Sequence, residues 1–337
     1  MPRSSSLRKK VFVTREIDRG ALERLRAAAA VTVWPGDGPP PTPAMRSALT
    51  DADALLSMVT DKIDAHTIEN APRLRVISNM AIGVDNIDLD AATRAGIAVG
   101  HTPGVVTDAT ADLAFGLLMA TARRIAEADR LVRAGKGRHW GPMMLLGRDV
   151  HSSTLGLVGF GEIGQAMARR AMGFAMRVLY LKHRSARRTQ PHNDPQLASA
   201  VAVSLPRLLA QSDYVSIHVP LTTKTHHMIG ARELARMKPG AILINTARGP
   251  VVDQAALAAA LKSGHLGGAA LDVTEPEPIS PRDPLLRLDN VVITPHIGTA
   301  SIATRTSMAA MAVDNILDVF AGRVPRWCAN EKVRLRP

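Results

Sequence analysis

The feature that most constrains this chain is a glycine-rich turn between a strand-like run and a helix-like run. From Leu155 the chain reads LGLVGFGEIGQAMARRAM, and a second strand-like run, RVLYL, follows. Gly159 permits a tight turn, Gly161 lets a pyrophosphate approach the backbone, and Gly164 lets helix and strand pack closely. The first amides of the helix favour an anion. A glycine-rich connection without function is the alternative, but this order of elements favours a βαβ unit that holds a dinucleotide.

The second strand of this unit is followed by basic residues. A ribose with a free 2′-hydroxyl is usually held by an Asp or Glu about 20 residues after the glycines, and none is found there. The position carries Lys182, Arg184, Arg187 and Arg188, with Ser185 as a hydroxyl donor. Such a cluster attracts a 2′-phosphate, whereas the alternative is a set of merely solvated charges. We therefore expect NADP(H) as the preferred cofactor, NAD(H) as the second choice, and Arg184 and Ser185 as direct contacts.

Short β-rich runs alternate with amphipathic helix-length stretches along almost the whole chain. This alternation is typical of βαβ units and predicts the α/β class, with parallel sheets in two units. The chain is expected to cross between the units near residues 102–104 and 296–299, and to form long helices after Thr107. The expected strands are residues 11–14, 31–34, 54–58, 75–79 and 97–100 in the first unit, and 155–158, 177–181, 214–218, 241–245, 269–272 and 291–293 in the second. A last helix is expected over residues 301–320.

Composition narrows the classes of partner. The 337 residues have a net charge of +12 but only 3% aromatic side chains, so the stacking platforms of single-strand binders are missing and anionic small molecules fit better. The single cysteine, Cys328, excludes a disulfide framework and a cysteine zinc site, and we expect no metal. Apolar runs are too short to span a membrane, and the basic, Ser-rich start of the chain lacks the apolar core of a secretory signal. We expect a cytoplasmic location.

Polar side chains follow three of the predicted strands, where chemistry collects in open α/β sheets. Arg248 follows the strand AILIN, Asp272, Glu275 and Glu277 follow GAAL, and His296 follows VVI. Arg248 can grip a carboxylate and polarise the neighbouring carbonyl, and a histidine can transfer the proton that accompanies a hydride. Glu277, if bonded to the imidazole, would fix its tautomer. Each residue alone is as well explained as a loop charge, but together, downstream of a dinucleotide turn, they predict a hydride-transfer site.

Six segments, in order, make the chain resemble the D-isomer-specific 2-hydroxyacid dehydrogenases, particularly their glyoxylate/hydroxypyruvate reductase branch. They are GVDNIDLDAATRAGIAV, TPGVVTDATADLAFGLLMA, GLVGFGEIGQAMARRA, NTARGPVVDQAAL, ALDVTEPEP and TPHIGTAS. The resemblance implies a Rossmann-type cofactor domain over residues 104–298 and a discontinuous flavodoxin-like substrate domain over 1–103 and 299–337. It also implies reduction of small 2-keto acids to D-2-hydroxy acids.

The resemblance also assigns residues. It implies that Arg248 holds the substrate, that His296 is the acid/base with Glu277 as its partner, and that Asp272 orients the nicotinamide amide. The backbone around Ile82 and Gly83 would receive the substrate carboxylate, and Ser57 and Met58 would line the pocket. The cofactor contacts that we expect are Thr110, Gly159, Phe160, Gly161, Glu162, Ile163, Gly164, Lys182, Arg184, Ser185, His218, Pro220, Thr225, Ala247, Asp272 and Gly298.

Members of the family are typically homodimers joined near the long helices after Thr107, and a homodimer is expected here. Trp140, Met143 and Met144 either reach toward a neighbouring active site or, as we favour, pack at the interface. Glu277 in place of glutamine argues against the formate dehydrogenase branch. The alternatives kept open are another substrate, such as 2-ketogluconate or phosphoglycerate, a dinucleotide-sensing corepressor, and, ranked behind both, a nucleic-acid binder.

Overall fold

The computed structural model describes residues 8–137, 139–181 and 194–336. Contacts within the chain divide it into two units, one formed by Met1–Val106 with Ala300–Pro337 and the other by Thr107–Thr299. Each unit is a parallel sheet with helices on both faces, so the predicted α/β class is confirmed. None of the helices in the described ranges combines the length and apolarity needed to cross a membrane.

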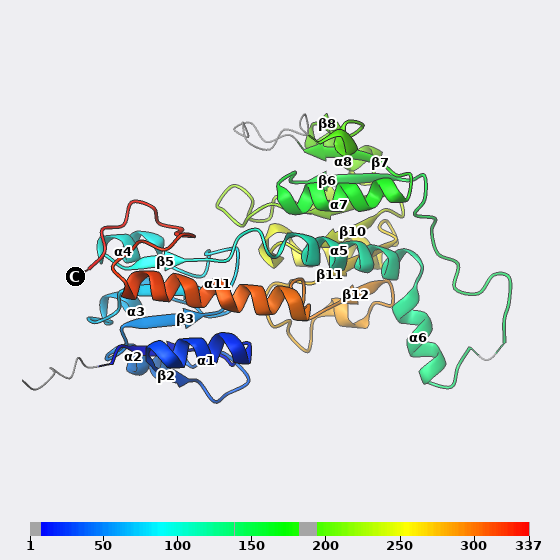
Figure 1. Cartoon of the computed structure of the whole chain (residues 1–337). Coiled ribbons are helices and arrows are strands. Elements are labelled where there is room, and N and C mark those ends of the chain that lie inside the picture. Colours follow the sequence, from blue (N-terminus) through cyan, green and yellow to red (C-terminus); the bar gives the residue numbers. More distant parts are fainter. Residues whose placement is uncertain (1–7, 138, 182–193, 337) are drawn as a thin grey trace, which may run out of the picture. The chain divides into compact units, whose positions relative to one another are not determined.

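The first unit has five parallel strands in the order β2-β1-β3-β4-β5 (Figure 1), which is the flavodoxin-like order. Its strands are β1 (Lys10–Val13), β2 (Ala30–Val33), β3 (Ala54–Ser57), β4 (Val76–Asn79) and β5 (Ala98–Gly100). Its helices are α1 (Arg19–Ala28), α2 (Thr42–Leu49), α3 (Ala65–Glu69), α4 (Leu89–Arg94) and α11 (Ile302–Phe320).

Alternate side chains of these strands enter two apolar layers. In β1, Val11 and Val13 join the layer of α1 and α11, whereas Phe12 joins the opposite layer with Met45 of α2. Strands covered on both faces are apolar at nearly every position, as these are. The helix α11, far along the chain, is fixed here because the Ser78 hydroxyl donates to its Ala312 carbonyl at 2.8 Å.

The second unit has seven parallel strands in the order β12-β11-β10-β9-β6-β7-β8, the doubly wound order of dinucleotide-binding sheets with one added strand (Figure 1). Its strands are β6 (Thr154–Val158), β7 (Arg177–Leu181), β8 (Val201–Val203), β9 (Tyr214–Ile217), β10 (Ile242–Asn245), β11 (Gly268–Leu271) and β12 (Val291–Ile293). Its α-helices are α5 (Thr107–Ala122), α6 (Ile125–Arg133), α7 (Glu162–Gly173), α8 (Leu205–Gln211), α9 (Ala231–Leu234) and α10 (Gln254–Lys262), and its short 3-10 helices are η2 (Pro195–Leu197), η3 (Gly249–Val251) and η4 (Pro284–Arg287).

The same alternation builds the core of the second unit. Ile242 and Ile244 of β10 enter the layer of α5 and α7, and Leu243 enters the opposite layer with side chains of α8, α9 and α10. A Cβ on Gly156 of β6 would lie 2.3 Å from the Ser212 hydroxyl, so only glycine lets the sheet approach the end of α8 this closely. Because both faces are closed by helices, the carboxyl edge of the sheet is left for a ligand.

One strand differs from the sequence-based expectation. The edge strand β8 is not predicted, because it has three residues and its first two side chains face solvent, so it shows no apolar run. The long helices expected after Thr107 are α5 and α6, and between them Arg124 adopts a left-handed conformation with φ of 52°. Its guanidinium then binds Glu127 one turn into α6, at 2.7 and 2.8 Å.

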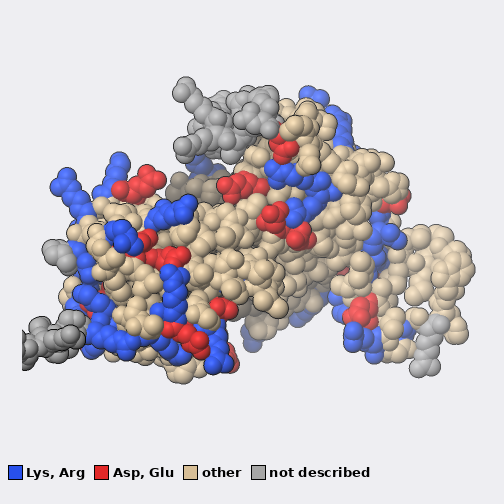
Figure 2. Space-filling view, in the orientation of Figure 1, with Lys and Arg blue, Asp and Glu red and all other residues tan. Residues whose placement is uncertain are grey.

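On the face shown in Figure 2, the basic and acidic side chains of the described residues lie among one another. Many of the described cations are paired, for example Arg170 with Asp108 and Asp112, and Arg24 with Asp314. Paired cations bind a polyanion less well than free ones.

Candidate active site

The glycine-rich turn is the first part of the site. Gly159 has φ of +106°, and a Cβ there would lie 2.5 Å from the His218 carbonyl oxygen. A Cβ on Gly164 would lie 2.4 Å from the Gly159 oxygen, whereas the Cβ position of Gly161 meets nothing within 4 Å. Gly161 is also the N-cap of the twelve-residue α7, with no side chain capping the helix. Open space at the uncapped start of a helix fits a dinucleotide pyrophosphate.

The neighbours of this turn are well packed. The Phe160 ring stacks on Tyr180 of β7 with centroids 4.0 Å apart, and Glu162 accepts a hydrogen bond from the Thr107 hydroxyl at 3.2 Å. Ile163 is part-buried at the second position of α7. The His218 ring is hydrogen-bonded through Nε2 to the Ser216 hydroxyl at 2.9 Å. Burial lowers the pKa of His218 to about 4, so this imidazole is neutral at pH 7.

Four other expected cofactor contacts lie in two pairs within the described residues. The Thr225 hydroxyl donates to the Pro220 carbonyl at 2.6 Å, and this bond closes the loop after β9. Thr110 of α5 is buried and lies 3.6 Å from the Cβ position of Gly298, so these two meet. Lys182, Arg184 and Ser185, with Arg187 and Arg188, lie outside the described residues.

Arg248 follows β10 in a loop that two features fix. The Asn245 side chain donates from Nδ2 to the Arg248 carbonyl at 2.9 Å and accepts from the Ala247 amide at 3.0 Å. A Cβ on Gly249 would lie 2.0 Å from the Thr274 carbonyl oxygen. This contact between backbones holds the Arg248 loop against the loop that follows β11, which carries the two glutamates.

His296 and Glu277 form a direct pair. The imidazole Nδ1 lies 2.5 Å from the Glu277 Oε1, with 28% of the His296 side chain and 30% of the Glu277 side chain exposed. A carboxylate in this position accepts from Nδ1–H and leaves Nε2 for a reacting group. His296 has a left-handed backbone with φ of 55°, and its amide donates to the Asp272 carbonyl at 2.9 Å.

Asp272, at the end of β11, holds the loop that carries His296. It is 2% exposed. Its Oδ1 accepts from the Thr294 hydroxyl at 2.6 Å and from the Ile297 amide at 2.8 Å, and its Oδ2 accepts from the Gly298 amide at 2.8 Å. Because a buried carboxylate with three donors is rigid, it fixes the Thr294 side chain before His296 and the two backbone amides after it.

The strands β10, β11 and β12 are neighbours in one sheet, so Arg248, Asp272, Glu277 and His296 follow adjacent strand ends. The structure joins His296 to Glu277 and Asp272 by hydrogen bonds, and joins the loop of Arg248 to theirs through Gly249. Arg248 is part-buried, and its Nη1 donates to the Ala247 carbonyl at 2.8 Å. The arrangement offers a cation, a paired imidazole and a dinucleotide turn on one unit.

The expected substrate residues other than Arg248 lie in the first unit, on two cross-linked loops. The buried Ser57 hydroxyl donates to Asn79 Oδ1 at 2.9 Å, and Asn79 Nδ2 donates to the Gly83 carbonyl at 2.9 Å. Met58 is held through its carbonyl by Asn86 at 3.1 Å. Ile82, 38% exposed, accepts from a ring nitrogen of His101 at 2.9 Å. These bonds fix the backbone whose amides are expected to meet a carboxylate.

Sequence reasoning overlooked the side chains that hold these loops. Asn79 ends β4 as Asn245 ends β10, and the search for polar residues at strand ends, extended to every strand, would have found both. Asp61 had no such signal, although it is 1% exposed and accepts from the Met58 amide at 2.7 Å. Its position depends on how the turn after β3 folds back.

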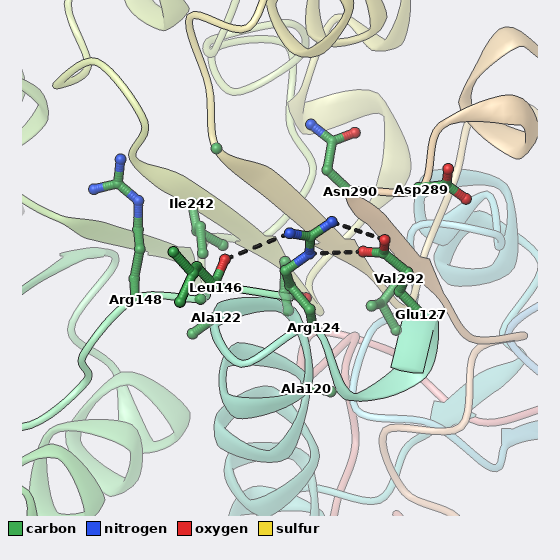
Figure 3. A pocket seen from close by; sticks show the side chains of 13 residues that line it. Ala120, Ala122, Arg124, Glu127, Leu146, Arg148, Ile242, Asp289, Asn290 and Val292 are labelled. Carbon is green, nitrogen blue, oxygen red and sulfur yellow. Dashed lines mark hydrogen bonds and ion pairs between the residues drawn. The ribbon is translucent and has the colours of Figure 1, made fainter. Parts of the chain in front are cut away.

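A cavity of about 370 Å³ lies elsewhere in the second unit, at the amino ends of β10, β11 and β12 (Figure 3). It is lined by the end of α5, the start of α6 and the segment Leu146–Arg148, with Arg124 bonded across it to Glu127. The opposite edge of the sheet carries the four residues described above, so this cavity is not part of the candidate active site.

The comparisons with known proteins show the family of this chain. Residues 115–298 match the family described as D-isomer specific 2-hydroxyacid dehydrogenase, NAD binding domain. The chain is 50% identical over 333 residues to the glyoxylate reductase of Korarchaeum cryptofilum, covering 98% of this chain and 99% of that one.

Solved structures of other proteins are also similar to this chain in fold and sequence. The crystal structure of a protein from Thermus thermophilus superposes with a TM-score of 0.88 at 47% identity, covering 95% of this chain and 99% of that one. The NADPH-dependent glyoxylate/hydroxypyruvate reductase of Sinorhizobium meliloti, in complex with NADP and malonate, superposes with a TM-score of 0.81 at 29% identity, covering 98% and 99%.

Proposed function

Because the chain belongs to the D-isomer-specific 2-hydroxyacid dehydrogenase family, we propose that its preferred substrates are glyoxylate and hydroxypyruvate, reduced to D-2-hydroxy acids with NADPH before NADH. The broader activity is that of the glyoxylate reductase branch: an NAD(P)-dependent oxidoreductase that reduces 2-keto acids. The main structural support for keto acid reduction is the 2.5 Å contact between His296 and Glu277, at the edge of a sheet that also has the glycine-rich turn expected to bind a dinucleotide.

The reaction needs a hydride and a proton, and when bound the reduced nicotinamide supplies the hydride. His296 Nε2 gives the proton to the carbonyl oxygen of the keto acid, while Glu277 holds Nδ1 and stabilises the imidazolium before the transfer. Arg248 grips the substrate carboxylate and polarises the carbonyl. Asp272 keeps the His296 loop in place, and the resemblance adds that it orients the nicotinamide amide.

The first unit offers backbone amides that suit an anion. The resemblance implies that the amides around Ile82 and Gly83 receive a carboxylate, and Ser57 and Met58 border the same loops. Asn79 and His101 hold the carbonyls of Gly83 and Ile82, so those peptide planes are fixed before the substrate arrives. A fixed pair of amides binds an anion without the cost of ordering a loop.

Two sequence features and one comparison support the preference for NADPH. No carboxylate stands after β7, where NAD-using members carry one, and four basic residues with Ser185 stand there instead. The reductase of Sinorhizobium meliloti that this chain resembles is described as NADPH-dependent. Arg184→Asp should raise the preference for NADH, with the exposed Arg232→Asp of α9 as a control that leaves it unchanged. An Arg184→Asp protein with the wild-type ratio of NADPH to NADH efficiency would refute the phosphate contact.

The activity itself is tested with a panel of 2-keto acids, including glyoxylate, hydroxypyruvate, 2-ketogluconate and phosphohydroxypyruvate, against both reduced cofactors. We expect the highest kcat/KM with glyoxylate or hydroxypyruvate and NADPH. Tight binding of the dinucleotide with negligible turnover of every keto acid would instead support the corepressor alternative. Retention on DNA that weakens strongly as salt rises would support a nucleic-acid binder.

We further propose a homodimer in the cytoplasm. The described part of α6 has no buried side chain, and Ile125, Val132 and Leu146 are 54%, 66% and 56% exposed. Trp140 and Met143 are 88% and 77% exposed, with Met144 beside them. An apolar surface of this kind, bordering the cavity of Figure 3, fits a second copy of the chain.

A further inference from the structure

The loop of residues 273–278 carries two glutamates, and each of them meets a histidine. Glu277 pairs with His296 in the proposed reaction. Glu275 has a separate set of partners: His227 Nε2 lies 2.6 Å from its Oε2, and His226 Nε2 lies 3.9 Å from its Oε1. The proposed reaction uses none of these three side chains.

The three ligand atoms lie within 4.8 Å of one another. No other trio of His, Cys, Asp or Glu side chains converges in this way within residues 8–137, 139–181 and 194–336. The two imidazoles are stacked, with ring centroids 4.1 Å apart. A tetrahedral zinc ion, with bonds of about 2.0–2.1 Å, holds its ligand atoms roughly 3.3 Å apart. The separations of 2.6 and 3.9 Å from Glu275 lie on either side of that value.

We propose that His226, His227 and Glu275 form a binding site for Zn²⁺. Two imidazoles and one carboxylate suit zinc, whereas magnesium and calcium prefer oxygen ligands alone. The His226 and His227 side chains are 52% and 40% exposed, so the ion reaches the site from solvent and water completes its coordination. From the sequence, no metal is expected because the chain has a single cysteine. This site has two histidines and one glutamate as ligands, so the cysteine count does not exclude it.

The backbone presents these side chains in a fixed way. His227 has φ of 48°, a left-handed conformation that is costly for a histidine. Its backbone N–H donates a hydrogen bond to the Pro250 carbonyl at 2.8 Å, which holds this conformation. The Glu275 amide donates to Gln254 Oε1 at 2.8 Å. Strain that the surroundings maintain is concentrated at functional sites. A simple ion pair needs only one imidazole, whereas here two face the same carboxylate.

The bound ion joins two segments 48 residues apart in sequence, the turn at residues 222–227 and the loop that also bears Glu277. The ion would cross-link these two segments, and the site stands whether or not the proposed reaction is correct. Its test does not depend on turnover.

The experiment titrates the full chain, freed of metal with a chelator, with zinc chloride in the presence of a chromogenic zinc chelator. We expect one tightly bound zinc per wild-type chain. His226→Ala, His227→Asn and Glu275→Gln should each weaken binding at least about 10-fold. Asparagine is chosen at position 227 because it tolerates a left-handed backbone. His151→Ala, an exposed histidine 3.9 Å from Asp149, and His296→Asn should retain the wild-type affinity.

Thermal unfolding gives a second measurement on the same proteins. Zinc should raise the Tm of the wild type and of His151→Ala, but not that of His226→Ala, while magnesium should raise none of them. Equal Tm values of the variants without zinc show that they fold. The proposal is overturned if the wild type takes up no stoichiometric zinc, or if the three ligand variants bind zinc as well as the two controls do.

Discussion

At the scale of single residues, the candidate site depends on one imidazole held in an uncommon backbone conformation. His296 combines a φ of 55° with a 2.5 Å contact to Glu277, and the Asp272 carboxylate accepts from the two backbone amides that follow it. Few residue types tolerate this conformation, and asparagine is one of them. His296→Asn therefore removes the proton donor with little added backbone strain.

We predict that His296→Asn lowers kcat for keto acid reduction by about 10² to 10⁴, because general acid catalysis contributes about that much. Binding of the dinucleotide, followed by fluorescence, should stay near the wild-type value, since the glycine turn is untouched. His151→Asn is the matched control and should retain full activity. A near-normal kcat for His296→Asn would remove this residue from the role of proton donor.

The neutral His218 gives a prediction for stability against pH. Its pKa is about 4 in the folded state against 6.5 for an unperturbed histidine, so the unfolded chain binds more protons between these values. Stability that is fully present above pH 6.5 is then lost as the pH falls toward 4, by about 2 kcal/mol between pH 7 and pH 5.

The measurement is urea unfolding of the wild type and His218→Gln at pH 7 and pH 5, a window above the range where most carboxylates titrate. The glutamine variant should lose less stability than the wild type on going from pH 7 to pH 5. His151→Gln is the control and should lose as much as the wild type does. Equal losses in all three proteins would contradict the neutral, buried assignment of His218.

At the scale of elements, the site is assembled by loops that touch through their backbones. Gly249, the first residue of η3, lies where a Cβ would be 2.0 Å from the Thr274 carbonyl oxygen. The contact places the loop after β10 against the loop after β11, and so relates Arg248 to Glu277. No flexible side chain is available to move aside, because the obstructing atom belongs to the backbone.

We predict that Gly249→Ala separates these loops, with a fall in kcat/KM and a loss of about 1–3 kcal/mol in the free energy of unfolding. Steady-state kinetics and urea unfolding measure the two effects. Gly116→Ala is the control, because Gly116 lies in α5 with nothing within 4 Å of its Cβ position. That variant should be neutral or slightly stabilised, since alanine favours the helix. Wild-type kinetics for Gly249→Ala would show that the contact does not position Arg248.

At the scale of the whole molecule, α6 and the segment after it stand out, because their apolar side chains are exposed within the described chain. We predict that the wild type is a dimer in solution and that Val132→Glu shifts it toward monomer by placing a charge in the interface. Light scattering after gel filtration gives the mass of each species.

Ile302→Glu is the control for this measurement. Ile302 is 91% exposed at the start of α11, so a charge there should leave the mass unchanged. A monomeric wild type, or a Val132→Glu protein that remains dimeric, would exclude this surface as the interface.

The sequence by itself determined the α/β class, all the strands except β8, and the dinucleotide turn. These are local properties: an apolar run, a glycine triplet and a helix-length stretch each lie within a few dozen residues, so periodicity reveals them. The order of polar residues at strand ends also indicated which side chains to examine. The resemblance to a family then assigned their roles, and the comparisons confirmed the family and the keto acid reduction.

Only the tertiary structure decided which of these side chains meet. That Asp272 holds the His296 loop, that Gly249 lies against Thr274, and that His226 and His227 face Glu275 all depend on the order β9, β10, β11 and β12 in the sheet. The physical reason is that hydrogen bonds between loops are set by the strand order and by the packing beneath them. The spacing of residues along the chain determines neither the strand order nor this packing.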